Sequence, residues 1–193
     1  MSQSNQRFFI ALVPPLDIEQ QITEIKLYFA EHYNTRGALN SPPHVTLQPP
    51  FEWLAADVPK LEESLKAFAA NRLPILVTLS GFAAFDPRVI YVDVVKSRAL
   101  LEMQQDLMSY LEANLGVVDR LSQTRPFVPH MTVAFRDLTR ENFQAAWLEF
   151  AGREIHFEFT ASALTLLLHD DSRWNSSNQF PLAAEPATIL NQS

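Results

Sequence analysis

The sequence predicts an α+β domain in which each half contributes a small antiparallel sheet with helices on its outer side. Three observations lead to this fold class. Strand-like and helix-like segments follow one another in an irregular order that includes hairpins, which is typical of α+β proteins. One motif, Pro-His-apolar-Thr-apolar, occurs twice, at residues 43–47 and 129–133. The 193 residues, 47% of them hydrophobic, suffice for one domain with a substantial core.

The first third of the chain is predicted to form a strand, a helix and the strand of the first motif. Residues 8–13 are an apolar run that two prolines stop, as expected for a strand buried on both faces. A helix follows because apolar residues recur at helical spacing at Ile18, Ile22, Ile25 and Phe29. After a loop at residues 35–41, the first motif is an extended strand that Pro49-Pro50 is expected to end.

The middle of the chain is predicted to contain a helix, a β-hairpin and a second helix, over residues 58–70, 73–95 and 98–115. The hairpin is inferred from the turn signal Asp86-Pro87-Arg88 between two strand-like segments. The second helix has one apolar side and is expected to end at Gly116. These elements separate the two motifs.

The last third is predicted to contain an irregular stretch, the strand of the second motif, a helix and a second hairpin, over residues 117–127, 129–133, 139–150 and 155–168. The hairpin is expected because residues 155–159 and 163–168 both have strand patterns and are close in sequence. Residues 176–193 are mostly polar, so a partly ordered end is expected.

The two motifs place a histidine and a threonine on the same face of each strand. Successive side chains on a strand point to opposite faces, so His44 lies beside Thr46 and His130 beside Thr132. Imidazoles titrate near pH ~6.5, and two of them can serve as base and acid in one step. The hydroxyls can donate hydrogen bonds to developing charge. Because a phosphodiester centre uses all four groups, we interpret the motifs as two walls of one active site.

These motifs resemble the two-histidine phosphoesterase superfamily, and in particular its bacterial 2′-5′ RNA ligase and 2′,3′-cyclic phosphodiesterase branch. The opening strand Arg7-Phe8-Phe9-Ile10-Ala11-Leu12 with its following Pro14-Pro15, and the late strand at residues 164–169, support the likeness. The resemblance covers approximately residues 7–182. It implies two lobes related by a pseudo-twofold axis around a central groove. We therefore predict one bilobal domain at residues 1–182 and a tail at residues 183–193.

The resemblance also implies the activity, which is metal-independent opening of 2′,3′-cyclic phosphates on RNA ends or nucleotides. With a 5′-hydroxyl as nucleophile, the same site would form a 2′-5′ RNA bond. His44 and His130 would be the catalytic residues, and Thr46 and Thr132 would bind the phosphate. No cofactor and no metal are expected. The sequence leaves open which histidine is the base and which cyclic phosphate is the physiological substrate.

Four further residues are candidates for contact with substrate. Arg88 lies at the predicted turn and Tyr91 on the strand after it, whereas Arg125 precedes the second motif and Arg136 follows it. Positive charge near the histidines would attract an anionic substrate to an acidic protein. The alternatives are solvated surface positions for the arginines and a core position for Tyr91.

Composition restricts the partners. The net charge of −7 argues against binding of long duplex nucleic acid, which needs clustered Lys and Arg, but it is compatible with an RNA end or a small nucleotide. There is no cysteine and no apolar run of membrane-spanning length. The polar start lacks a signal-peptide pattern, so a cytoplasmic location is expected. The oligomeric state is left open.

The same residues are also compatible with two other classes of function. A metal-dependent hydrolase would use His44, His130, His169 and Asp170 as ligands. A non-catalytic module would keep the site to hold the phosphate of a nucleotide or an RNA end. Metal analysis tests the first class, and turnover measurements test the second.

Overall fold

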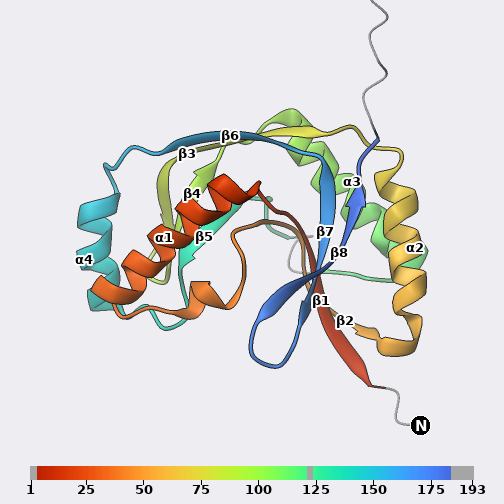
Figure 1. The fold of residues 1–193 in the computed structure, drawn as a ribbon, viewed down its shortest axis with the longest axis horizontal. Helices are drawn as coiled ribbons and strands as arrows, with labels where there is room; N and C mark the ends of the chain where they lie inside the picture. Colours follow the sequence, from red (N-terminus) through yellow and green to blue (C-terminus); the bar gives the residue numbers. More distant parts are fainter. Residues whose placement is uncertain (1–3, 121–123, 184–193) are drawn as a thin grey trace, which may run out of the picture.

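The computed structural model of the protein describes residues 4–120 and 124–183, which form two four-stranded antiparallel sheets and four α-helices (Figure 1). The predicted α+β class is confirmed. The first sheet has the order β2-β1-β7-β8, with β1 at Asn5–Leu12, β2 at Val45–Leu54, β7 at Ala163–His169 and β8 at Trp174–Pro181. The second has the order β5-β4-β3-β6, with β3 at Ile75–Phe85, β4 at Val89–Val94, β5 at His130–Ala134 and β6 at His156–Ala161.

The first sheet combines strands from both ends of the chain, so the expectation that each half builds its own sheet is wrong in this respect. β1 is a central strand that pairs with β2 on one side and β7 on the other. Its side chains are buried on both faces, as predicted. Phe8, Ile10 and Leu12 belong to the main core, whereas Phe9 and Ala11 form a small separate cluster with Leu167 and Trp174. A strand that is apolar on both faces requires such a central position.

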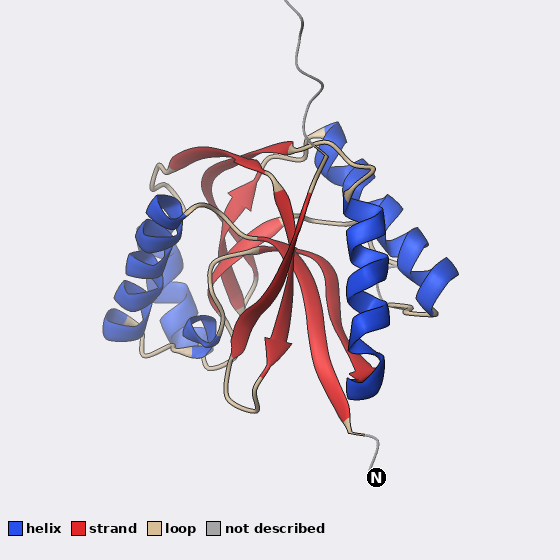
Figure 2. Ribbon diagram, turned by 45° about the vertical axis from the view of Figure 1, so that its right-hand side comes forward, coloured by secondary structure: helices blue, strands red, loops and turns tan. Residues whose placement is uncertain are grey.

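The helices lie in two pairs at opposite ends of the molecule (Figures 1 and 2), with α1 at Leu16–His32, α2 at Val58–Ala69, α3 at Arg98–Leu115 and α4 at Arg140–Phe150. α1 contacts β5 and α4 contacts β4, both in the second sheet, whereas α2 contacts β7 and β8 of the first. α3 contacts both sheets, through β2 of the first and β3 of the second. α1 therefore follows a strand of the first sheet but covers the second. This exchange joins both sheets in one hydrophobic core. Within the described residues, no helix combines the length and apolar character needed to cross a bilayer.

β2 continues through Pro49 and Pro50, so the prediction that these prolines end the strand is wrong. β2 is an edge strand, and its register with β1 shifts between Phe8 and Ile10, opposite the two prolines. A proline lacks the N–H donor of the strand ladder, which an edge strand or a bulge tolerates. The strand therefore bends at the prolines but does not stop.

The predicted hairpin between β6 and β7 is also wrong. β6 pairs with β3 in the second sheet, whereas β7 lies between β1 and β8 in the first. β7 has four consecutive buried residues, which require neighbours on both sides and both faces. Local alternation does not distinguish this arrangement from a hairpin. The hairpin of β3 and β4 is confirmed, as is the end of α3 at Gly116, whose φ is 67°.

The end of the described chain is more ordered than expected. Residues of the predicted partly ordered segment form β8, which pairs with β7 and buries Phe180. The partner strand supplies the backbone hydrogen bonds that make a polar sequence adopt a strand. Of the tail predicted at residues 183–193, all but Ala183 lies outside the described residues.

Candidate active site

The strands of the two motifs meet, although 86 residues separate the histidines. β2 and β5 are edge strands of their sheets and contact each other. His44 immediately precedes β2, and His130 is the first residue of β5. Together with Thr46 and Thr132, these histidines line one cavity of about 270 Å³. The structure thus brings together the four side chains that the sequence singles out.

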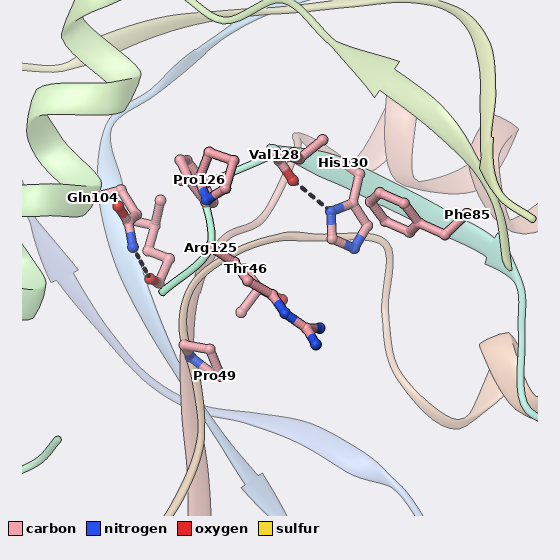
Figure 3. A pocket seen from close by; sticks show the side chains of 10 residues that line it. Thr46, Pro49, Phe85, Gln104, Arg125, Pro126, Val128 and His130 are labelled. Carbon is pink, nitrogen blue, oxygen red and sulfur yellow. Dashed lines mark hydrogen bonds between the residues drawn. The ribbon is translucent and has the colours of Figure 1, made fainter. Parts of the chain in front are cut away.

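The two imidazoles are held in the same way. Nδ1 of His44 lies 2.7 Å from the carbonyl oxygen of Pro42, and Nδ1 of His130 lies 2.7 Å from that of Val128 (Figure 3). Because a carbonyl oxygen only accepts, Nδ1 carries the hydrogen and Nε2 is left to exchange protons. The intervening Pro43 and Pro129 fix the backbone between each donor and its acceptor. The proline of the motif therefore has a role in orienting the ring that follows it.

Aromatic side chains support both rings. The ring of Phe9 lies 4.7 Å from that of His44, and the rings of Phe85 and Tyr91 each lie 5.2 Å from that of His130. Tyr91 is 5% exposed and pairs with Thr132 across the strands. Tyr91 therefore occupies a core position, which was the alternative to substrate contact, and its ring packs beside that of His130.

The charges around the two histidines differ. The pKa of His44 is lowered to about 4, mainly by burial and also by the positive charges of Lys26 and His130, while the hydrogen bond to Pro42 acts in the opposite direction. Burial also lowers the pKa of His130, but its hydrogen bond to Val128 and the negative charge of Asp93 oppose this shift. Asp93 faces His130 across the strands. Both imidazoles therefore favour the neutral form, and His44 has the more cationic surroundings.

Lys26 was not predicted from the sequence, where it belongs to an ordinary amphipathic helix. It is 2% exposed, and its Nζ donates to the carbonyl oxygen of Ser41 at 3.0 Å. Burial lowers its pKa to about 8. The sequence alone does not show this buried ammonium, because it arises only when α1 packs against the segment before the first motif.

The arginines occupy different positions. Arg136 lines the cavity of the histidines, together with Arg7, which the sequence did not suggest. Arg125 lines an adjoining cavity. Arg88 is exposed at the turn between β3 and β4 and lines neither cavity. The position of Arg7 depends on the pairing of β1 with its neighbours, so no local pattern predicts it.

Asp137 connects the segments next to the two motifs. Its carboxylate accepts hydrogen bonds from the Thr35 hydroxyl at 2.6 Å and from the backbone N–H groups of Arg36 and Gly37 at 2.8 and 3.1 Å. The neighbouring Arg136 has a φ of 70°, which is rare for a residue with a side chain. The loop after β5 is therefore fixed to the short 3₁₀ helix η1 (Gly37–Asn40), which precedes the first motif.

The metal-ligand set considered from the sequence is not brought together. His169 lines the cavity with His44 and His130, but Asp170 does not. The Asp170 carboxylate accepts hydrogen bonds from Ser172, Arg173 and Asn175 within the turn after β7. Among the residues that the structure describes, no three His, Cys, Asp or Glu side chains are grouped to hold a metal ion.

The chain is similar to known proteins over most of its length. A protein of Geobacillus kaustophilus with the name "Putative phosphoesterase GK0864" is 28% identical over 177 residues, which cover 90% of this chain and 95% of the relative. A protein of Staphylococcus aureus (strain Newman) with the name "Putative phosphoesterase" is 26% identical over 179 residues, which cover 90% and 98%.

Two solved structures share the fold. TT0787 of Thermus thermophilus has a TM-score of 0.67 at 19% identity, covering 93% of this chain and all of that one. The apo form of E. coli LigT has a TM-score of 0.63 at 22% identity, covering 94% and 99%. A family model described as the 2′-5′ RNA ligase superfamily matches residues 14–173, a span that includes both motifs. The protein therefore belongs to the 2′-5′ RNA ligase superfamily, the two-histidine phosphoesterases that its motifs predict.

Proposed function

We propose that the protein is a metal-independent phosphodiesterase that opens 2′,3′-cyclic phosphates on RNA ends or free nucleotides. Membership of the superfamily supports a phosphodiesterase or ligase-like enzyme. The observation that carries the specific proposal is the pair of imidazoles, each fixed through Nδ1 to the carbonyl oxygen two residues earlier, in one cavity with two threonines. Such an enzyme would act on its substrates in the cytoplasm.

In the proposed reaction, Nε2 of one neutral histidine takes a proton from water as the water oxygen attacks phosphorus. The bond between phosphorus and one ribose oxygen breaks, and the other, protonated histidine gives its proton to that oxygen. The hydroxyls of Thr46 and Thr132 donate hydrogen bonds to the non-bridging oxygens. Arg7 and Arg136 add positive charge beside the developing anion. The product is a nucleoside 2′- or 3′-phosphate.

Complexes of E. coli LigT support the class of substrate. This structural neighbour has been solved with 3′-AMP, with phosphate and with ATP. A nucleotide with one phosphate group at the histidine pair is consistent with these ligands. The reverse direction, with an RNA 5′-hydroxyl in place of water, would form a 2′-5′ bond in the same site.

The test is product analysis after incubation with 2′,3′-cyclic nucleotides and with a short RNA that ends in a cyclic phosphate. We expect turnover in excess EDTA, and we expect His44→Ala and His130→Ala each to reduce kcat by about 10²–10⁴-fold, the usual contribution of an acid or base. Activity that disappears with EDTA and returns with zinc would contradict the metal-free reaction. Nucleotide binding without any turnover would contradict the enzyme and favour a binding module.

A further inference from the structure

A second, larger cavity of about 550 Å³ adjoins the cavity of the histidines (Figure 3). The two cavities share Thr46, Phe85 and His130, but His44 and Thr132 line only the smaller one. A volume of this size lies in the range of pockets for small ligands, about 300–1,000 Å³. A substrate with its phosphorus between the histidines therefore lies next to the larger cavity, at the side chains that the two cavities share.

The lining of the larger cavity is mostly apolar, with polar groups at separate points. The apolar residues are Leu47, Pro49, Phe85, Pro126, Phe127 and Val128. Figure 3 shows Gln104 at one end and His130 with Phe85 at the other. Flat aromatic rings stack well on such surfaces, and every nucleobase has a flat face.

Gln104 provides a fixed polar group in this cavity. It is 9% exposed, and its Nε2 donates to the carbonyl oxygen of Leu47 at 3.4 Å, which ties α3 to β2. A primary amide offers a second N–H and an oxygen with free lone pairs. These groups match the edge of a nucleobase, which presents donors and acceptors side by side.

Arg125 gives the cavity its positive charge. Among the residues that line the larger cavity, it is the one with a guanidinium group. A guanidinium plane can stack on a base or pair with a phosphate, and it would attract an anionic nucleotide to a protein with a net charge of −7.

We infer that the larger cavity binds the nucleobase and ribose of the nucleotide whose phosphate lies between the histidines. This inference rests on the proposed function for the position of the phosphate, and it deepens that proposal by placing the rest of the substrate. Phe127 supplies a stacking surface and Gln104 contacts the base edge. The smaller cavity then holds the phosphate and the attacking water or 5′-hydroxyl.

The test measures binding by calorimetry, so that it does not depend on turnover. The probes are adenosine 3′-monophosphate and inorganic phosphate, applied to the wild-type chain and to F127A, F127L and Q104L. We expect each variant at Phe127 to weaken nucleotide binding by about 5- to 150-fold, the range for loss of one stacking contact, with phosphate binding unchanged. F127W, which keeps an aromatic face, should restore most of the affinity, and Q104L should weaken it by a smaller factor.

The matched control is F157A, which removes a half-buried phenylalanine from β6, outside both cavities. Variants at Trp174, which lines only the smaller cavity, test the opposite placement. Loss of nucleotide binding in W174A with none in F127A and F127L would overturn the inference. Equal affinity of the wild-type chain for nucleotide and phosphate would also overturn it. A chain that binds nucleotide in the expected way but has no turnover would contradict the proposed activity and leave the base site supported.

Discussion

The two histidines have the same backbone anchor but different neighbours, and this difference supports different roles for them in the proposed reaction. Lys26 lies near His44 and favours its neutral form, whereas Asp93 faces His130 across the strands and favours its protonated form. A base must start neutral and an acid must start protonated. We infer that His44 is the base and His130 the acid when the cyclic phosphate is opened. Because His130 also lines the larger cavity, it would lie beside the leaving ribose oxygen.

This assignment predicts the pH dependence of kcat/KM, which reports the free enzyme. The pKa of His44 is about 4, and that of His130 is lowered from its ordinary value. The active form, with His44 neutral and His130 protonated, is therefore most populated above the pKa of His44 and below the lowered pKa of His130. We expect a bell-shaped profile with its maximum on the acid side of neutrality. The profile of kcat should lie at higher pH, because a bound phosphate anion raises both pKa values.

Asp93→Asn tests the assignment. Loss of the carboxylate charge lowers the pKa of His130 further. The alkaline limb of kcat/KM, and with it the pH optimum, should therefore move to lower pH, while the acid limb stays in place and the height of the maximum does not rise. If His44 were instead the acid and His130 the base, the active form would be the less populated of the two singly protonated forms. Lowering the pKa of His130 toward that of His44 would then increase this population and raise the maximum value of kcat/KM. Glu63→Gln, which removes an exposed carboxylate from α2, is the control for net charge.

At the scale of elements, the site depends on the contact between η1 and the loop after β5. A Cβ atom added to Gly37 would lie 2.5 Å from the carbonyl oxygen of Phe135, which is closer than atoms can approach. Gly37→Ala should therefore separate the two segments and displace His44 relative to His130. A displacement of about 1 Å can cost about 10²-fold in rate.

We accordingly expect G37A to lower kcat/KM by at least about tenfold. Gly152→Ala is the matched control, since its Cβ would meet nothing within 4 Å. Thermal unfolding of both variants distinguishes a displaced site from a lost fold. Wild-type kcat/KM in a folded G37A protein would show that this contact does not position the histidines.

The elements also show what sequence patterns can predict. The helices and the hairpin of β3 and β4 follow from periodicity and from a turn signal, because these depend on residues close in sequence. The partners of β6, β7 and β8 do not, because strand pairing is decided by burial across the whole sheet. Pro49-Pro50 indicates a strand end unless the strand is known to be at an edge, where the missing N–H is tolerated.

At the scale of the whole molecule, the exchange of helices between the sheets holds the two motif strands in contact. The ring of Phe150 in α4 lies 4.5 Å from that of Phe29 in α1 and 5.0 Å from that of Phe82 in β3. The motif residues were predictable because the motif is repeated along the chain. Gln104 and Lys26 were not, because each acquires its position only through the packing of its helix.

The overall charge predicts how the reaction depends on salt. The two cavities contain three arginine side chains, Arg7, Arg125 and Arg136, in a protein with a net charge of −7. Each phosphate contact to a single strand contributes about −0.7 to the slope of log affinity against log salt concentration. Three neutralised phosphates of a short RNA would give a slope of about −2, whereas the single phosphate of a cyclic nucleotide would give about −0.7. Screening of the repulsion between an acidic protein and RNA makes the slope shallower. We expect log(kcat/KM) to fall with a slope no steeper than about −0.7 for a cyclic nucleotide and no steeper than about −2 for a short cyclic-phosphate-ended RNA. A slope near −4 or steeper for the RNA alone would indicate an extended surface that binds the RNA backbone. Such a result would contradict recognition of the RNA end only.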